Sequence, residues 1–242
     1  MVVFVGQLDK DSPDHLSGLN LNRQRLADQI SAVLREQILV EKFPAGSPIH
    51  ERETAEAIGV SRTPLREALF ILEAEGLVDM SPAKSPIVSN PTLEEISELA
   101  MVQSALEALA GEMACKTASD DEIQDILEIH AALMAYPDDA DPIEFFRVDM
   151  SFHEAIVQAS GNSALVKTHR QYNTRLWRAR YQASSRAIRR QNTLKEHGMI
   201  ADALQRRDAK SVSSKLRTHI RNVTTNLQRL DKAEQTFPTS KA

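Results

Sequence analysis

The chain has 242 residues, 26% of them charged and 5% aromatic, with a formal net charge of −5 and a single cysteine. This length suits two domains that each bury a core, and one cysteine excludes an intramolecular disulfide framework. Few aromatic residues and only eight glycines favour helix, so we expect a mainly α protein. The negative net charge argues against a protein that holds nucleic acid by electrostatic attraction alone.

No apolar run approaches the ~20 residues that a transmembrane helix needs, and the first ten residues lack the basic segment of a signal peptide. We therefore expect a cytoplasmic protein with no membrane partner. Residues 1–20 and 233–242 are predicted to be flexible terminal tails.

The first predicted helix covers residues 21–40. Phe-Pro-Ala-Gly at residues 43–46 breaks it. We expect its apolar stripe to pack behind the two helices that follow. The stripe consists of Leu26, Ile30, Val33, Leu34 and Ile38.

Residues 51–88 predict a short helix, a tight turn, a second helix and a two-stranded hairpin. Gly59 can take the positive φ that ends the first helix at about Ile58. Thr63 and Pro64 are expected to start the second helix, because a hydroxyl caps free N–H groups and proline has its φ already set. The buried face of that helix is then Leu65, Ala68, Leu69 and Leu72.

Arg62 and Arg66 lie one turn apart at the N-terminal end of this second helix, where two cations oppose the helix dipole. A solvated basic face is the ordinary interpretation of such a pair. A helix that enters the major groove also needs arginine there, because guanidinium binds guanine edges or phosphate. The turn, the proline start and the hairpin favour this second interpretation.

Residues 23–90 resemble the winged helix-turn-helix of GntR-type bacterial transcription regulators, most specifically through VSRTPLREAL at residues 60–69. The resemblance implies a DNA-binding domain of three helices and a small hairpin over residues 21–90. It also implies a homodimer that binds a palindromic operator. The operator contacts that it implies are Arg52, Arg62, Thr63 and Arg66, with Lys84 in a wing at residues 82–87.

Residues 21–90 hold eight basic and ten acidic residues, so the cations are concentrated at the motif and not spread over the segment. Two positions depart from the family pattern: Lys84-Ser85 replaces the usual Arg-Gly of the wing, and Thr54 replaces a leucine. We expect weak non-specific attraction, with affinity from base contacts and from two copies that bind together.

Residues 91–232 predict an all-helical domain of about six helices, with Thr92 as the cap of the first. Charge is segregated, because residues 91–144 hold fourteen acids and one base, whereas residues 163–232 hold seventeen bases and four acids. We expect acidic helices to pack near basic ones; a second nucleic-acid site on the basic half is the alternative. Breaks are expected at 119–120, 136–142, 160–162, 189–193 and about 208.

Asp149 and His153 are four residues apart, which places a carboxylate and an imidazole on one helical face. His197 and His219 lie on later predicted helices. One aspartate and three histidines suit a divalent metal such as Zn, Ni, Mn or Fe. Histidines on helices are more often structural than ligands, so the spacing alone leaves both interpretations open.

Residues 93–228 resemble the FCD domain, an all-helical effector-binding domain of GntR regulators, most clearly through DMSFHEAIVQASGN at residues 149–162. The resemblance implies that Asp149, His153, His197 and His219 bind a divalent metal, and that a small carboxylate effector completes its coordination. Gln103 stands where an arginine is common. The effector-binding candidates are therefore Gln103 with Arg175, Arg178 and Arg180, while His130 and His169 are treated as structural.

These observations predict a metabolite-responsive transcription regulator, with repression as its expected mode, and not an enzyme. Two alternatives stay open. The metal could be purely structural, without a small-molecule effector. The same ligands could also serve a metal-dependent hydrolase or oxygenase, although no general base or nucleophile stands out beside them and the helix-turn-helix would then have no role.

Overall fold

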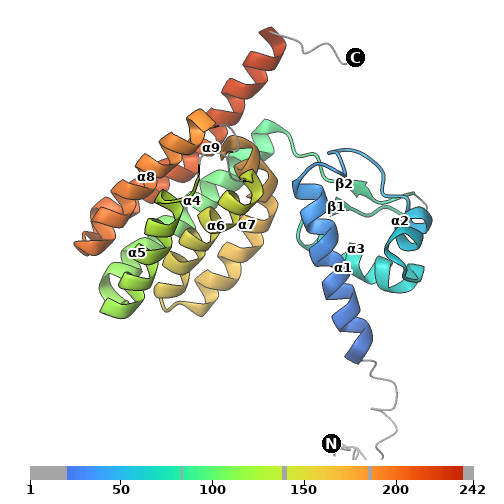
Figure 1. The fold of residues 1–242 in the computed structure, drawn as a ribbon, viewed down its shortest axis with the longest axis horizontal. Helices are drawn as coiled ribbons and strands as arrows, with labels where there is room; N and C mark the ends of the chain where they lie inside the picture. Colours follow the sequence, from blue (N-terminus) through green and yellow to red (C-terminus); the bar gives the residue numbers. More distant parts are fainter. Residues whose placement is uncertain (1–20, 83, 138–140, 185–186, 237–242) are drawn as a thin grey trace, which may run out of the picture.

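A computed structural model describes residues 21–82, 84–137, 141–184 and 187–236 (Figure 1). The predicted tail at residues 1–20 lies outside these ranges. Of the predicted tail at 233–242, residues 233–236 form the end of the last helix, and residues 237–242 lie outside the described part. Within the described residues, no helix is both long and apolar enough to cross a membrane.

The fold is mainly α, as predicted, and its two parts are the winged helix and a helical bundle (Figure 1). The winged-helix part contains α1 (Leu21–Leu39), α2 (Glu51–Ile58), α3 (Arg62–Ala74), β1 (Val78–Asp79) and β2 (Ile87–Val88). The bundle contains α4 (Leu93–Thr117), α5 (Asp120–Met134), α6 (Pro142–Ala159), α7 (Ser163–Ser184), α8 (Ala187–Gln205) and α9 (Ala209–Thr236).

The turn between α2 and α3 forms as the sequence predicts, because Gly59 ends α2 in the left-handed conformation with φ 71°. The predicted cap at Thr63 is wrong. Ser61 is the N-cap residue and α3 begins at Arg62, so Thr63 is the second helical residue and Pro64 the third. Proline is tolerated at that position because the first four N–H groups of a helix have no partner within it.

The core of the winged helix forms where α1 packs on α3. Ile30, Leu34 and Ile38 are buried as predicted, but Leu26 and Val33 are 37% and 51% exposed. Ala27 and Ser31 are buried, so the buried stripe of α1 is rotated from the predicted one. The strands that flank the predicted wing at residues 82–87 are antiparallel, with Val78 paired to Val88 and Asp79 to Ile87.

The predicted starts of α4 and α5 are confirmed. Thr92 and Ser119 each form a capping box with the glutamate three residues later. The predicted break at residues 189–193 is wrong, because α8 runs from Ala187 through this segment. Its polar residues resemble a loop in sequence, but the guanidinium of Arg190 packs 4.1 Å from the centre of the Phe145 ring and is largely buried.

Helix α4 is the axis of the bundle and packs against α6, α7 and α9. The acidic α4 therefore lies beside the basic α7 and α9, as the charge pattern predicts. At the crossing of α4 with α9, Gly111 leaves room for Val212 and Leu216, and a Cβ atom there would overlap both side chains. The close approach of these helices thus depends on a residue without a side chain.

Replacing Gly111 by alanine should lower the free energy of unfolding by ~1–3 kcal/mol, because the added methyl overpacks the α4–α9 crossing. Gly198 on α8 is a matched control, because a Cβ there would lie 3.9 Å from His130 Nε2 in ordinary contact. Gly198→Ala should be neutral or stabilise by up to ~1 kcal/mol through helix propensity. Urea denaturation followed by circular dichroism measures both, and equal effects would contradict the packing argument.

Candidate functional site

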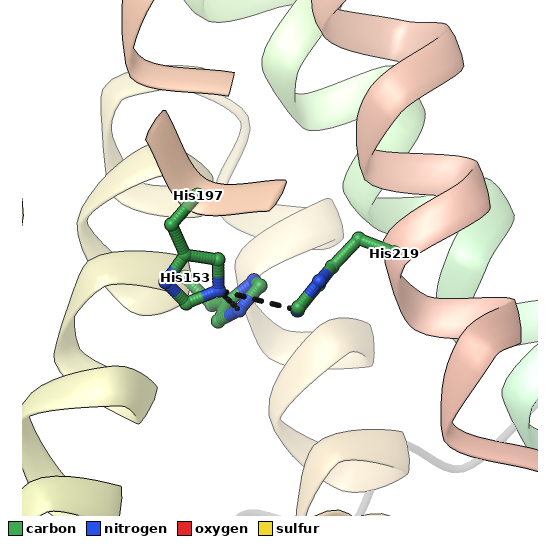
Figure 2. Close-up of side chains that lie close together, drawn as sticks. All are labelled: His153, His197 and His219. Atoms are coloured by element: carbon green, nitrogen blue, oxygen red, sulfur yellow. Dashed lines mark hydrogen bonds between the residues drawn. The ribbon is translucent and has the colours of Figure 1, made fainter. Parts of the chain in front are cut away.

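Three histidines from three helices meet inside the bundle, and their ligand nitrogens all lie within 4.8 Å of one another (Figure 2). His197 Nε2 lies 3.2 Å from His153 Nε2 and 3.2 Å from His219 Nε2. The exposed fractions of His153, His197 and His219 are 0%, 0% and 7%, so the cluster is sealed from bulk solvent.

Asp149 lies one turn before His153 on α6 and turns its carboxylate toward the same point. Its Oδ1 is 3.5 Å from His197 Nε2 and has no hydrogen-bond partner among the described residues. Burial raises the pKa of Asp149 to about 6, because the low-dielectric interior disfavours the charged form. The structure thus brings all four predicted metal ligands together.

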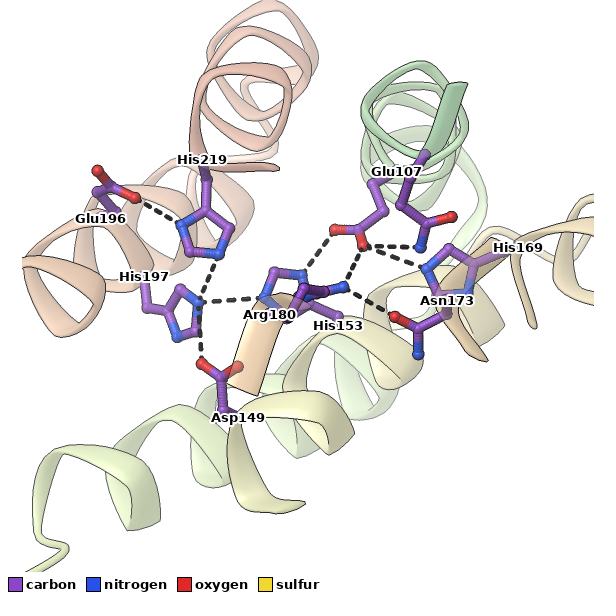
Figure 3. Close-up of polar contacts among 10 residues, drawn as sticks. Glu107, Asp149, His153, His169, Asn173, Arg180, Glu196, His197 and His219 are labelled. Carbon is purple, nitrogen blue, oxygen red and sulfur yellow. Dashed lines mark hydrogen bonds and ion pairs between the residues drawn. The ribbon is translucent and has the colours of Figure 1, made fainter. Parts of the chain in front are cut away.

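Two carboxylates orient the outer histidines of the cluster (Figure 3). Glu107 Oε2 lies 2.6 Å from His153 Nδ1, and Glu196 Oε2 lies 2.6 Å from His219 Nδ1. Because a carboxylate only accepts, each Nδ1 donates, and the Nε2 lone pairs of both rings are directed into the cluster. This arrangement presents electron pairs to a shared point.

Burial also keeps the central imidazoles neutral. It lowers the pKa of His153 to about 3, despite the opposing influence of Glu107, and it holds the pKa of His197 well below the ordinary value. Neutral imidazoles retain the lone pairs that bind metals. His153 and His197 therefore have the protonation state that metal ligands require.

Glu107 connects the cluster to a second buried polar network. Its Oε1 accepts hydrogen bonds from Arg180 Nη1 at 3.1 Å, Gln103 Nε2 at 3.3 Å and His169 Nε2 at 3.2 Å (Figure 3). Burial opposes ionisation of Glu107, but His153 and Arg180 outweigh it and hold its pKa well below the ordinary value. Sequence reasoning gave no role to Glu107, because its partners His153, His169 and Arg180 lie on the separate helices α6 and α7.

The effector-binding candidates divide into two groups. Gln103 and Arg180 lie in the Glu107 network and are 0% and 3% exposed. The structure does not bring Arg175 and Arg178 there, because side chains two and five positions before Arg180 leave α7 on another face. The side chain of Arg175 lies against Gly76, and Arg178 Nη2 lies 2.9 Å from Glu41 Oε1.

Arg178 and Glu41 belong to the junction where the end of α1 docks on α6 and α7. Leu39 of α1 packs in one apolar cluster with Phe146 and Met150 of α6, bordered by Trp177 and Tyr181 of α7. Next to this cluster, Glu41 has a left-handed backbone with φ 59°, which is strained for a residue with a side chain.

The candidate nucleic-acid interface is a groove of about 670 Å³ between α2, α3 and the wing. Arg52, Arg62, Arg66 and Lys84 line it. Thr63 is exposed beside them on α3. The side chain of Glu51, 13% exposed, lies 3.3 Å from Arg62 and 3.8 Å from Arg66. One carboxylate thus positions both arginines at the groove while leaving them more than half exposed.

Comparison with known proteins identifies both parts. Residues 26–88 match the family described as bacterial regulatory proteins, gntR family, and residues 98–222 match the FCD domain. The chain belongs to the GntR family. Its family members and relatives are transcriptional regulators, so the enzyme alternative is excluded.

Curated relatives match over most of their length. The repressor NanR of Klebsiella aerogenes is 27% identical over 239 residues, which cover 89% of this chain and 90% of that one. The repressor RspR of Escherichia coli is 23% identical over 208 residues, 86% of this chain and 91% of that one. The solved structure of E. coli McbR/YncC has the same fold, with a TM-score of 0.72, 20% identity, and coverage of 85% and 98%.

Replacing Glu107 by leucine should lower the free energy of unfolding by ~3–5 kcal/mol, because Arg180 would be left buried without its carboxylate. Glu112→Leu is the matched control on the same helix. Its carboxylate pairs with Lys116 at the surface, with a side chain 42% exposed, so its loss should change stability little. Guanidinium denaturation separates the two, and a Glu107 variant as stable as the control would contradict a central role for this carboxylate.

Proposed function

We propose that this regulator binds a palindromic operator as a homodimer, and that a divalent metal and a small carboxylate effector in the bundle modulate this binding. The observation that carries the proposal is the convergence of Asp149 and three buried histidines on one point. As a regulator of bacterial DNA it would act in the cytoplasm, with repression relieved by the effector as the expected mode.

Operator contacts are assigned to the groove beside α3. Arg62 and Arg66 would bind guanine edges or phosphates, with Arg52 and Thr63 beside them and Lys84 reaching from the wing. When the protein binds DNA, Arg62 and Arg66 would give up their ion pairs with Glu51 and contact the operator instead. Because both arginines are more than half exposed, these pairs are weak and the exchange costs little.

A second copy of the chain is expected because one winged helix offers few cations. Helix α4 presents exposed apolar residues that could bury against a partner. They are Met101, Val102 and Leu109, with exposed fractions of 56%, 40% and 47%. The two recognition helices, related by a two-fold axis, would each contact one half-site, so that both contribute to the binding free energy.

The residues present fit a divalent cation. Two Nε2 lone pairs are fixed by Glu107 and Glu196, and the Asp149 carboxylate is buried with one oxygen unpartnered among the described residues. Nitrogen and oxygen donors of this kind suit Zn, Ni or Mn. When bound, the metal would supply a Lewis-acidic site for an effector carboxylate. Because all four ligands are buried, a purely structural metal is the second candidate, distinguished by the absence of exchangeable coordination positions.

Helix α6 would couple this site to the DNA-binding part. It carries the ligands Asp149 and His153, and it also carries Phe146 and Met150, which pack against Leu39 of α1. Ligand binding can change operator affinity only if it prefers one arrangement of this junction over another. A movement of α6 on metal or effector binding would alter the packing at Leu39 and so supply that difference.

Elemental analysis tests the metal site. We expect one divalent metal per chain after loading with Zn, Ni or Mn, and loss of that metal in Asp149→Ala, His153→Ala and His197→Ala, because each removes a ligand. His130→Ala is the control, since His130 on α5 lies beside Phe152 and not in the cluster. Full occupancy in the ligand variants, or none in the wild type, would refute the assignment.

Operator binding is tested by fluorescence anisotropy on a site selected from random-sequence DNA. Arg62→Ala and Arg66→Ala should each weaken binding by ~1–3 kcal/mol and relax base selectivity, because each removes a contact to a base edge or phosphate. Arg206→Ala, an exposed arginine after α8, is the matched loss of charge and should leave affinity nearly unchanged. Wild-type affinity in both α3 variants would remove this helix from the recognition surface.

A further inference from the structure

A second cavity, away from the histidine cluster, lies at the junction of the winged helix and the bundle. Its volume is about 90 Å³. The end of α1, the turn after α3 and the segment between β2 and α4 form the winged-helix side of its wall, and α4 and α7 form the bundle side (Figure 1). Helix α7 contributes Arg175, Arg178, Ala179 and Gln182. The cavity is thus walled by both parts of the protein.

Two arginines of this wall have donor nitrogens available to a ligand. Arg178 donates through Nη2 to Glu41 Oε1 at 2.9 Å, but its Nε is buried and has no hydrogen-bond partner among the described residues. Arg175 forms neither a hydrogen bond nor an ion pair with any residue that the structure describes. A guanidinium nitrogen only donates, and native proteins rarely leave a buried donor unpaired. Arg178 Nε therefore indicates an acceptor that binds in the cavity.

Packing on α7 brings the two guanidinium groups to the same space. The stem of Arg175 lies against the backbone of Gly76, where a Cβ atom would come within 2.9 Å of Arg175 Cγ and 3.0 Å of its Nε. Arg178 follows Arg175 by three residues, so both side chains leave one face of the helix. A single small ligand can then contact both arginines.

Charge at the cavity favours an anion. Its wall contains two cations and no carboxylate, and Glu41, which pairs with Arg178, offsets only one of the two charges. A wider groove of about 510 Å³ shares Arg175 with the cavity and is lined by four carboxylates. These are Glu73, Asp79, Glu95 and Glu98. All four are exposed, and none pairs with Arg175 within the described part of the chain, so water screens their effect on the cavity.

The size of the cavity limits the ligand. A water molecule occupies ~30 Å³ of the liquid, so a cavity of about 90 Å³ accommodates a group of only a few heavy atoms. A phosphate group has this size, and its several acceptor oxygens suit the donors of two guanidinium groups. The cavity and the wider groove share Gly76, Ser89, Pro91 and Arg175, so a phosphate monoester could leave its organic part in the groove.

We infer that Arg175 and Arg178 form a second ligand site, which binds a phosphate group at the junction of the two parts. The ligand is inorganic phosphate or the phosphate of a small monoester, and one of its oxygens accepts from Arg178 Nε. It lies between α7 and the segment that joins β2 to α4. The site is separate from the metal site of the proposed function and does not depend on it.

Isothermal titration calorimetry of the full-length protein tests the site with inorganic phosphate, glycerol 3-phosphate and glycerol, at neutral pH and fixed ionic strength. We expect both phosphate compounds to bind and glycerol not to bind. Tighter binding of glycerol 3-phosphate would identify a monoester as the natural source of the phosphate, and tighter binding of inorganic phosphate would identify the free ion. Absence of binding by both phosphate compounds would overturn the inference.

Variants of α7 identify the residues. Arg175→Gln and Arg178→Gln should each weaken phosphate binding about tenfold or more, because each removes a charged hydrogen-bond donor. Glu41→Gln should strengthen binding severalfold, since Arg178 is then released from a competing carboxylate. Arg170→Gln, an exposed arginine on the same helix, is the matched loss of charge and should bind phosphate as the wild type does. A cooperative thermal transition in each variant shows that it is folded.

Two controls separate this site from other places that attract phosphate. Wild-type protein stripped of metal by a chelator, and the Arg62→Ala variant of the operator groove, should both keep the full affinity. Affinity lost in either control, or unchanged in both Arg175→Gln and Arg178→Gln, would overturn the inference. Because the stripped protein holds no metal, a failure of the proposed metal site leaves this test unaffected.

Hydrogen exchange locates the ligand independently of affinity. Phosphate should slow exchange at residues 87–92 in the wild type, because the ligand lies against this segment, and should not do so in Arg175→Gln. Phosphate that binds without protecting this segment would lie elsewhere on the protein, and the inference would be wrong.

Discussion

The arrangement of the bundle depends on the hydrogen bonds that the buried carboxylate of Glu107 accepts. Glu107 is 1% exposed, and it joins α4 to His153 on α6 and to His169 and Arg180 on α7. A buried ion of this kind is stable only when nearly all of its acceptor sites are used. Because four donors from three helices fill those sites, Glu107 fixes the relative positions of α4, α6 and α7.

Gly111 follows Glu107 by one turn of α4 and contacts a different neighbour, α9. Its missing side chain lets α9 approach through Val212 and Leu216, and α9 carries His219 seven and three residues further along. Helix α4 therefore positions two members of the histidine cluster. Its Glu107 orients His153, and its Gly111 allows α9, which carries His219, to pack closely. The site is built from packing constraints as much as from its ligands.

The sequence predicts the local parts of this protein well. The turn at Gly59, the arginines of α3 and the pair Asp149 and His153 all follow from spacings within one or two helical turns. What depends on tertiary contacts is not predictable in this way. Arg180 and Arg178 differ by two positions, yet one faces Glu107 and the other faces Glu41, and only the packing of α7 decides which.

His197 and His219 show the same limit, because they converge with His153 from separate helices and only the family resemblance placed them in one set. The misplaced break before α8 has a related cause. Polar residues there suggested a loop, but Arg190 is held in a helix by Phe145 and the carbonyl of Pro137, both distant in sequence. The composition of a segment shows how polar it is, but it does not show which distant residues will bury its polar side chains.

The same reasoning bears on how the two parts communicate in the proposed function. Phe146, Asp149, Met150 and His153 occupy successive turns of α6, so a rigid helix cannot move its ligands without moving the side chains that pack on Leu39. Close-packed interiors transmit such shifts because they have little free volume to absorb them. Glu41 has a strained backbone and is hydrogen-bonded to Arg178 of α7, and it lies at the junction of α1 with α6 and α7 that this movement would change. A ligand that repositions α6 by even a fraction of an ångström would therefore act on the end of α1, and α1 packs against α3, the helix that we propose contacts the operator.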